Sequence, residues 1–226
     1  MGMERKALTE KVYRGDRIDR NDALELFDWD LPALAMAADA RRRMVYPDDT
    51  VAFIIDRIVN YTIVCEASCR FCAYHVRPGG RNSYVMTHDE ILRRVEELAA
   101  LGGSQVMLQG GLHPGLTIDD LCGMLGLIRG RYPGIALHCF SPAETAHIAR
   151  KSGITIDDAI GRMAAAGLDS MPGASDLLVD RVRSAVSPRK LSRDEWREVM
   201  RALAGRGLPS SATMTYGMGE SLAERV

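Results

Sequence analysis

Three cysteines stand close together in the chain, and their spacing gives them a chemistry that isolated thiols lack. Cys65, Cys69 and Cys72 form a C-x3-C-x2-C array, with Phe71 directly before the last thiol. Three thiolates on one loop can hold three corners of an iron–sulfur cubane. The fourth iron then has no protein ligand, so this spacing predicts a cluster with one position open to a small molecule.

Two other uses of these cysteines compete with a cluster. Five cysteines, an odd number, and the lack of a secretory signal at the start argue against disulfides. Structural zinc is the stronger alternative, because His75 follows Cys72 by three positions and would complete a Cys3His ligand set. Zinc modules usually take ligands from two separated knuckles, whereas these four fall within eleven residues. The spacing favours the cluster and leaves zinc open.

Composition limits the class of protein. The chain of 226 residues is 46% hydrophobic and carries a formal net charge of −1, with both signs mixed throughout. This length and hydrophobic content suit one domain of ordinary size. No basic face predicts nucleic-acid binding, and no long uncharged apolar stretch predicts a membrane span. We therefore expect a cytoplasmic protein, in a compartment that keeps thiols reduced.

Apolar runs alternate with helical patterns, which predicts an α/β fold with parallel strands. The expected strands cover residues 51–59, 105–109, 135–140, 168–171 and 211–216. Capping boxes, in which Glu follows three residues after the cap, predict helix starts at Thr87, Ser141 and Ser192. We expect residues 1–50 to form a helical segment and residues 51–226 to form a partial barrel, truncated after about five βα units.

Polar residues follow all five expected strands. These groups are the cysteine loop, Gln109–Gly111, His138–Ser141, Asp169–Ser170 and Thr213–Gly217. The carboxyl ends of parallel strands meet at one edge of a sheet, where sites in such folds gather. The sequence therefore predicts one site on that edge, and this convergence favours a cluster over zinc.

The array, CEASCRFC, resembles the C-x3-C-x-aromatic-C signature of the radical S-adenosylmethionine (SAM) superfamily. Further segments are similar to the dehypoxanthine futalosine cyclases of the futalosine route to menaquinone: FIIDRIVNYTIVCEASCRFCAY, GGSQVMLQGGLHPGL, LHCFSPAETAHIARKSG, AGLDSMPG and LLVDRVRSAVSP. The likeness runs from about residue 19 to Tyr216 and is partly shared with aminofutalosine synthases and a deazaflavin-cofactor synthase subunit. Residues 178–188 favour the cyclase.

The resemblance implies a fold, cofactors and partners. The fold would be the TIM-like (β/α) barrel of radical SAM enzymes, and Cys65, Cys69 and Cys72 would hold a 4Fe–4S cluster whose open iron binds SAM. The resulting 5′-deoxyadenosyl radical would take hydrogen from the ribose of dehypoxanthine futalosine, and the sugar radical would then cyclise. An electron donor such as flavodoxin or ferredoxin would reduce the cluster.

The resemblance also implies residues that contact SAM. They are Phe71, Tyr74, Gln109, Gly110, Gly111, Ser141 and Ser170. The Gln-Gly-Gly run takes the place of a motif that meets the amino end of SAM, and glycine permits close backbone approach. The two aromatic residues lie beside the expected adenine position. The two serines have structural alternatives, as a helix cap and in a turn.

Two further residues are candidates for chemistry. His138 and Asp169 could accept or relay the proton released in the reaction; hydrogen-bonded structural roles are the alternative. The chain also departs from the cyclase pattern. Ile63 stands where the family has Asn, and Asp176 stands where a glycine-rich stretch would end in Glu. A carboxylate that is shorter by one methylene would have less reach toward SAM or the substrate.

Overall fold

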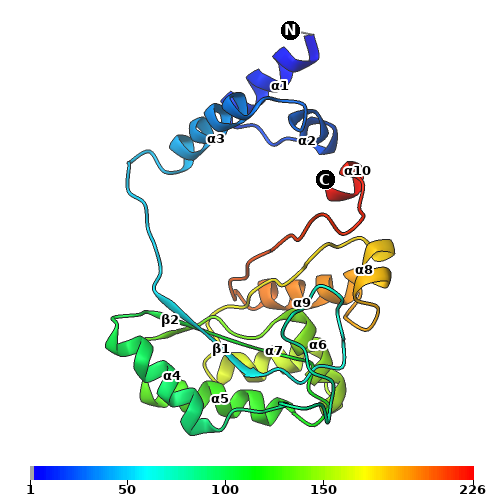
Figure 1. Ribbon diagram of the computed structural model, residues 1–226. Coiled ribbons are helices and arrows are strands. Elements are labelled where there is room, and N and C mark those ends of the chain that lie inside the picture. Colours follow the sequence, from blue (N-terminus) through cyan, green and yellow to red (C-terminus); the bar gives the residue numbers. More distant parts are fainter. Residues whose placement is uncertain (1–2) are drawn as a thin grey trace. The chain divides into compact units, whose positions relative to one another are not determined.

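The computed structural model describes residues 3–226, which form two compact units. One unit holds the residues up to Phe53 together with Glu220–Val226, and the other is Ile54–Gly219 (Figure 1). The cysteine array and the sheet belong to the second unit. No helix in the described part of the chain is long and apolar enough to cross a membrane.

The first unit is helical. Its helices are α1 (Met3–Arg14), α2 (Arg20–Leu26), α3 (Leu31–Val45) and α10 (Leu222–Arg225). Asp19 and Asp30 act as N-caps of α2 and α3, where a side-chain oxygen accepts from backbone N–H groups of the first turn. Leu8, Trp29 and Ala37 form a small core of their own.

The second unit is built on a parallel sheet in the order β1-β2-β3. The strands are β1 (Asp56–Thr62), β2 (Gln105–Gly110) and β3 (Ala136–Leu137). The fourth and fifth expected strands are each reduced to a single parallel bridge, His138 to Ser170 and Met171 to Ser210. Pro172 follows the fourth at once, and proline has no N–H to continue a ladder.

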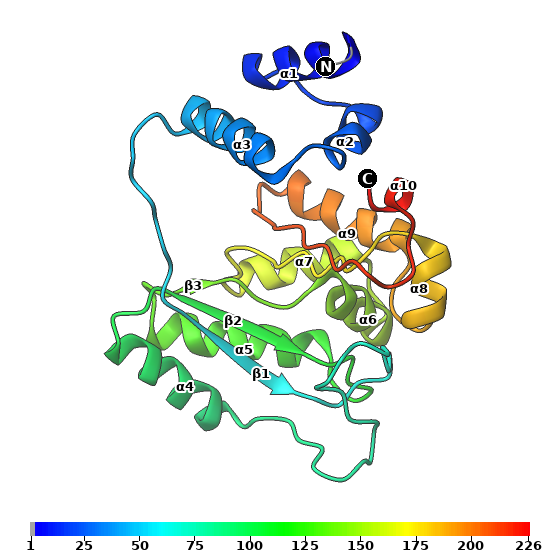
Figure 2. The same ribbon diagram turned by 45° about the horizontal axis from the view of Figure 1, so that its top comes forward.

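Helices connect the strands and cover the sheet. They are α4 (His88–Ala100), α5 (Ile118–Arg131), α6 (Pro142–Ser152), α7 (Ile156–Ala165), α8 (Asp180–Val186) and α9 (Arg193–Gly205). Figure 2 shows α4 and α5 along the same face of β1 and β2. Val106 and Leu108, on that face of β2, are fully buried in the core. The strands therefore end at one edge, above a packed interior.

Two of the three predicted capping boxes are confirmed, at Thr87 and Ser192. At Ser141 only half of the prediction holds. The Ser141 hydroxyl accepts from the backbone N–H of Glu144 at 3.3 Å and caps α6. The Glu144 carboxylate does not return to the backbone of Ser141, however, because it accepts hydrogen bonds from Tyr61 and Gly110 instead. The predicted capping box at Ser141 is therefore wrong, because the Glu144 carboxylate has other partners.

Candidate functional site

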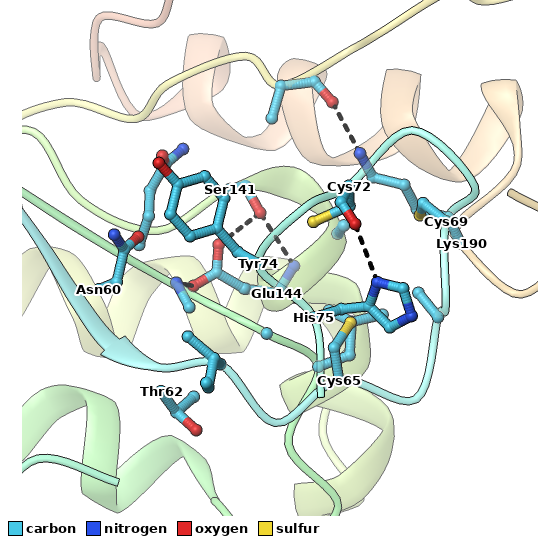
Figure 3. A pocket seen from close by; sticks show the side chains of 18 of the residues that line it. Asn60, Thr62, Cys65, Cys69, Cys72, Tyr74, His75, Ser141, Glu144 and Lys190 are labelled. Carbon is cyan, nitrogen blue, oxygen red and sulfur yellow. Dashed lines mark hydrogen bonds between the residues drawn. The ribbon is translucent and has the colours of Figure 1, made fainter. Parts of the chain in front are cut away.

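One cavity of about 250 Å³ lies at the carboxyl ends of β1 and β2 and the start of α6. The three cysteines reach it from the loop after β1, while Asn60, Thr62 and Glu144 lie on its other side (Figure 3). The residues predicted to bind a cluster or SAM that line this cavity are Cys65, Cys69, Cys72, Phe71, Tyr74, Gln109, Gly110, Gly111 and Ser141. The convergence predicted from the strand ends is therefore present for these nine residues.

Backbone hydrogen bonds fasten the cysteine loop to its neighbours. The N–H of Cys65 donates to the carbonyl of Val76 at 2.9 Å, so the loop folds back on itself. The N–H of Glu66 donates to the carbonyl of Leu112 at 3.0 Å, which joins the loop to the segment after β2. The thiols are thus presented from a fixed backbone.

The thiols fit a cluster better than a single metal ion. All five cysteines are free thiols. Within residues 3–226, no three His, Cys, Asp or Glu side chains are gathered as ligands of one ion. Nδ1 of His75 lies 3.0 Å from the carbonyl of Cys72, so this ring is engaged locally. A cubane spreads three thiolates over three irons, whereas zinc needs its ligands about 2.3 Å or less from one point. The zinc alternative would require regrouping of the loop.

A partly buried ion pair lies beside the thiols. Lys190 lines the cavity, and its Nζ donates to Oδ2 of Asp176 at 2.6 Å. Burial raises the pKa of the Cys69 thiol to about 11, and the Lys190 ammonium acts in the opposite direction. Coordination to a metal deprotonates a thiol outright, so bound iron would replace that proton. Lys190 then offers a positive charge to a site that gains negative charge.

The two glycines of the Gln-Gly-Gly run are required by the protein's own packing. A Cβ on Gly110 would lie 2.5 Å from Cζ of the Tyr61 ring. A Cβ on Gly111 would lie 2.2 Å from the carbonyl oxygen of Val64, directly before the cysteine array. The structure thus gives a packing reason for glycine at both positions, because an aromatic ring and the cysteine loop approach the backbone closely. The predicted approach of SAM stays a prediction.

Glu144 is the site residue that the sequence analysis missed. Its side chain is buried, and Oε1 accepts from the Tyr61 hydroxyl and from the N–H of Gly110, both at 2.8 Å. Oε2 accepts from the Ser141 hydroxyl at 2.5 Å. Burial raises the pKa of Glu144 to about 7, and these three donors oppose a further rise. Glu144 lies in the segment LHCFSPAETAHIARKSG, but the capping-box interpretation assigned its carboxylate to the backbone of Ser141.

Three predicted residues do not line the cavity. Nδ1 of His138 lies 2.7 Å from Oγ of Ser170, so these two residues bond to each other. His138 follows Leu137, which pairs with Val106. By the alternation of side chains along strands, His138 therefore shares the face of the sheet that carries Gln109.

Asp169 does not line the cavity, and its carboxylate accepts two hydrogen bonds. Its Oδ2 accepts from the backbone N–H of Leu137 at 2.7 Å and from Nη2 of Arg129 at 2.5 Å. The carboxylate thus ties α5 to the start of the bridge between β3 and the next segment. A catalytic role for His138 or Asp169 stays a prediction.

Fold and site together define an α/β protein in which three free cysteines and a glycine turn face one cavity at the strand ends. The Radical SAM superfamily profile matches residues 59–226, and the chain belongs to this superfamily. Membership makes it a domain of an enzyme class whose cofactors are a 4Fe–4S cluster and SAM.

Similar curated relatives include proteins with two different named activities. The chain is 36% identical over 220 residues to cyclic dehypoxanthine futalosine synthase of Halalkalibacterium halodurans, covering 96% of this chain and 60% of the relative. It is 39% identical over 224 residues to the Streptomyces coelicolor protein of that name, covering 97% and 56%. It is also 36% identical to 5-amino-6-(D-ribitylamino)uracil–L-tyrosine 4-hydroxyphenyl transferase 1 of Methanosarcina acetivorans, covering 97% and 57%. The chain thus spans less than two thirds of these relatives.

Solved structures agree on the fold. Methylornithine synthase (PylB) matches with a TM-score of 0.76 at 16% identity, covering 96% of this chain and 61% of that one. The hydrogenase maturase HydG matches with a TM-score of 0.74 at 15% identity, covering 96% and 47%. At these identities the likeness concerns the fold alone, and the predicted radical SAM α/β fold is confirmed.

Adding one methyl group at Gly111 should damage the site, whereas the same change in a helix should not. Gly111→Ala places a Cβ against the Val64 carbonyl and should lower the free energy of unfolding by about 1–3 kcal/mol. Gly123 lies within α5, where an added Cβ would have no neighbouring atom within 4 Å, so Gly123→Ala should stabilise the chain by up to about 1 kcal/mol. Urea unfolding of both variants measures the two effects, and equal shifts would contradict this packing.

Replacing Glu144 by Gln should change how stability depends on pH. The folded chain holds the Glu144 proton more tightly than the unfolded chain, since the pKa rises from 4.5 to about 7 on folding. The free energy of unfolding of the wild type should therefore fall as pH rises through this window. Glu144→Gln lacks this titration, and the two stability curves should diverge by about 3 kcal/mol.

Urea unfolding at several pH values measures this divergence. Glu198→Gln, on the exposed side of α9, is the matched control and should follow the wild-type curve. Parallel curves for Glu144→Gln and the wild type would show that burial does not govern this carboxyl.

Proposed function

We propose that this chain is the radical SAM domain of an enzyme that cyclises dehypoxanthine futalosine in menaquinone biosynthesis. The observation that carries the proposal is that three cysteines and the Gln-Gly-Gly run line one and the same cavity. The substrate rests on two curated relatives of that named activity, at 36% and 39% identity. It also rests on the resemblance of residues 178–188 to the cyclases.

Each wall of the cavity has a distinct task in this proposal. Cys65, Cys69 and Cys72 hold the cluster, and the bound cofactors supply a 5′-deoxyadenosyl radical. The backbone of Gly110 would lie beside the amino end of SAM. Glu144 holds that backbone in place by accepting a hydrogen bond from the N–H of Gly110. Positioning is the protein's main contribution, because a misplaced radical reacts with the wrong atom.

The segment that favours the cyclase lies between two residues that line the cavity, Ala174 and Lys190. Arg183, in α8, is buried and donates to the carbonyls of Ser175 at 2.9 Å and Leu177 at 3.3 Å. The same guanidinium donates to the carbonyl of Leu191 at 2.5 Å, next to Lys190. These bonds fix the residues on both sides of α8 around one cation. The segment is thereby connected to Lys190, which lines the cavity, and this connection supports its use in telling related enzymes apart.

The second candidate is the tyrosine 4-hydroxyphenyl transferase reaction of deazaflavin synthesis. Archaeal relatives with that name are 34–36% identical over 220 residues, close to the values for the cyclases. Both candidates use the same cluster and SAM, so they differ in what the remaining cavity holds. Aminofutalosine synthesis and a domain that binds a cluster without turnover are further alternatives.

Iron content tests the cluster directly. Anaerobic reconstitution should give about four irons and four sulfides per chain, with brown colour and broad visible absorption. Replacing any of Cys65, Cys69 or Cys72 by Ala should abolish the cluster, because each removes one of only three thiolate ligands. Cys122→Ala is the matched control, since this half-buried thiol in α5 does not line the cavity. Stoichiometric zinc without iron uptake would contradict the assignment.

Isotope transfer tests the substrate. With the reconstituted protein, SAM and dehypoxanthine futalosine should give a cyclic product that is two hydrogens poorer. Deuterium on the substrate ribose should appear in 5′-deoxyadenosine, because the deoxyadenosyl radical removes that hydrogen. Mass spectrometry of both products is the measurement.

Parallel assays separate the alternatives. Deoxyadenosine without deuterium would contradict the abstraction step. Turnover only with tyrosine and 5-amino-6-(D-ribitylamino)uracil would assign the chain to the transferases, and a covalent adduct of the adenosyl group would assign it to the aminofutalosine synthases.

A further inference from the structure

A second, larger cavity lies on the other side of the cysteine loop. Its volume is about 770 Å³, and its lining is rich in cations. The charged or titratable residues that line it are Arg77, Arg150, Lys151, Arg189, His147 and Glu66. Four permanent cations therefore face one carboxylate, on a chain whose formal net charge is −1. Positive charge is concentrated here and is not a property of the whole surface.

The cysteine loop is the wall between the two cavities. Ser68 lines the second cavity, while its neighbours Ala67 and Cys69 line the first. Leu112 borders both. Ser68 has a positive φ of 50°, a backbone conformation that few non-glycine residues adopt. Its Oγ is buried and has no hydrogen-bond partner among the described residues. A single turn of chain thus separates the basic surface from the thiols.

Two of the cations have no acidic partner of their own. Arg77 and Arg189 are exposed, and neither forms an ion pair within residues 3–226. Arg150 pairs with Glu195 at 2.5 Å. Lys151 lies 3.9 Å from Glu66, a partly exposed carboxylate that offsets little of the charge. Unpaired guanidinium groups on an exposed surface favour an acidic partner.

We infer that this basic surface docks a small acidic redox protein that delivers single electrons to the cluster. The inference rests on the proposed function, because only a cluster at the three cysteines gives the electron a destination. In the transfer, one electron leaves the reduced donor and one enters the cluster, and no atom moves. SAM and substrate occupy the first cavity in the proposed reaction. A donor protein can therefore approach the cluster without displacing them if it binds on the other side of the cysteine loop, at the second cavity.

Charge reversal tests the surface. In Arg77→Glu/Arg189→Glu, binding of a purified acidic flavodoxin at low ionic strength should weaken at least tenfold. Its dependence on salt should also become shallower, because fewer charges attract. Arg131→Glu/Arg201→Glu is the matched control: Arg131 ends α5, at the edge of the sheet opposite the cysteine loop, and Arg201 is exposed on α9. The control pair should bind flavodoxin like the wild type.

Two measurements follow each variant. Flavodoxin binding is measured on the chain both before and after cluster reconstitution. Reduction of the cluster is followed by bleaching of its visible absorption, with reduced flavodoxin or with photoreduced 5-deazariboflavin, which is small and uncharged. We expect the Arg77/Arg189 variant to be reduced at least tenfold more slowly by flavodoxin and at the wild-type rate by deazariboflavin.

The outcomes separate this inference from the proposed function. Wild-type flavodoxin binding and reduction in the Arg77/Arg189 variant would overturn the docking surface. Loss of inorganic phosphate binding with unchanged flavodoxin binding would also overturn it and indicate a small-anion site. If no cluster forms, the proposed function fails, while binding to the cluster-free chain still decides whether the surface recognises an acidic protein.

Discussion

One buried carboxylate holds the candidate site together. Moving a charged carboxylate out of water costs several kcal/mol, so Glu144 is stable there only because hydrogen-bond donors surround it. Those donors come from β1, from the end of β2 and from the cap of α6. Satisfying one group therefore fixes three elements relative to one another. The cavity lies where these elements meet, and its shape depends on this interaction.

Core side chains pack directly against the backbone that lines the cavity. The Tyr61 ring fills the space that a side chain on Gly110 would take, and it meets Phe140 edge-on with ring centroids 5.9 Å apart. Phe140 holds a positive φ of 61°, which a bulky residue adopts only when its surroundings require it. The backbone of the Gln-Gly-Gly turn is therefore supported by the core directly beneath it.

Local patterns predicted most of the site, and long-range partners account for what they missed. The cysteine spacing and the Gln-Gly-Gly run identify cavity residues correctly, because each can be recognised from residues that are neighbours in the sequence. Ser141-x-x-Glu144, in contrast, has the same local form as the true box at Thr87. What redirects Glu144 is the Tyr61 hydroxyl, 83 residues earlier in the chain. Asp169 likewise has a strand-end position that suggests chemistry, yet its partner Arg129 lies 40 residues away.

The contacts of Asp176 show what this residue does at the position where the cyclase pattern has Glu. Its carboxylate binds Lys190 instead of reaching the cavity itself, and Asp176 holds a positive φ of 53° while Ala174 holds 37°. Such conformations cost free energy and persist only where surrounding contacts enforce them. The buried guanidinium of Arg183 and the Lys190 pair supply those contacts. Asp176 therefore borders the site through Lys190: the ion pair holds the ammonium group near Cys69 and so joins the segment around Asp176 to the cysteine loop.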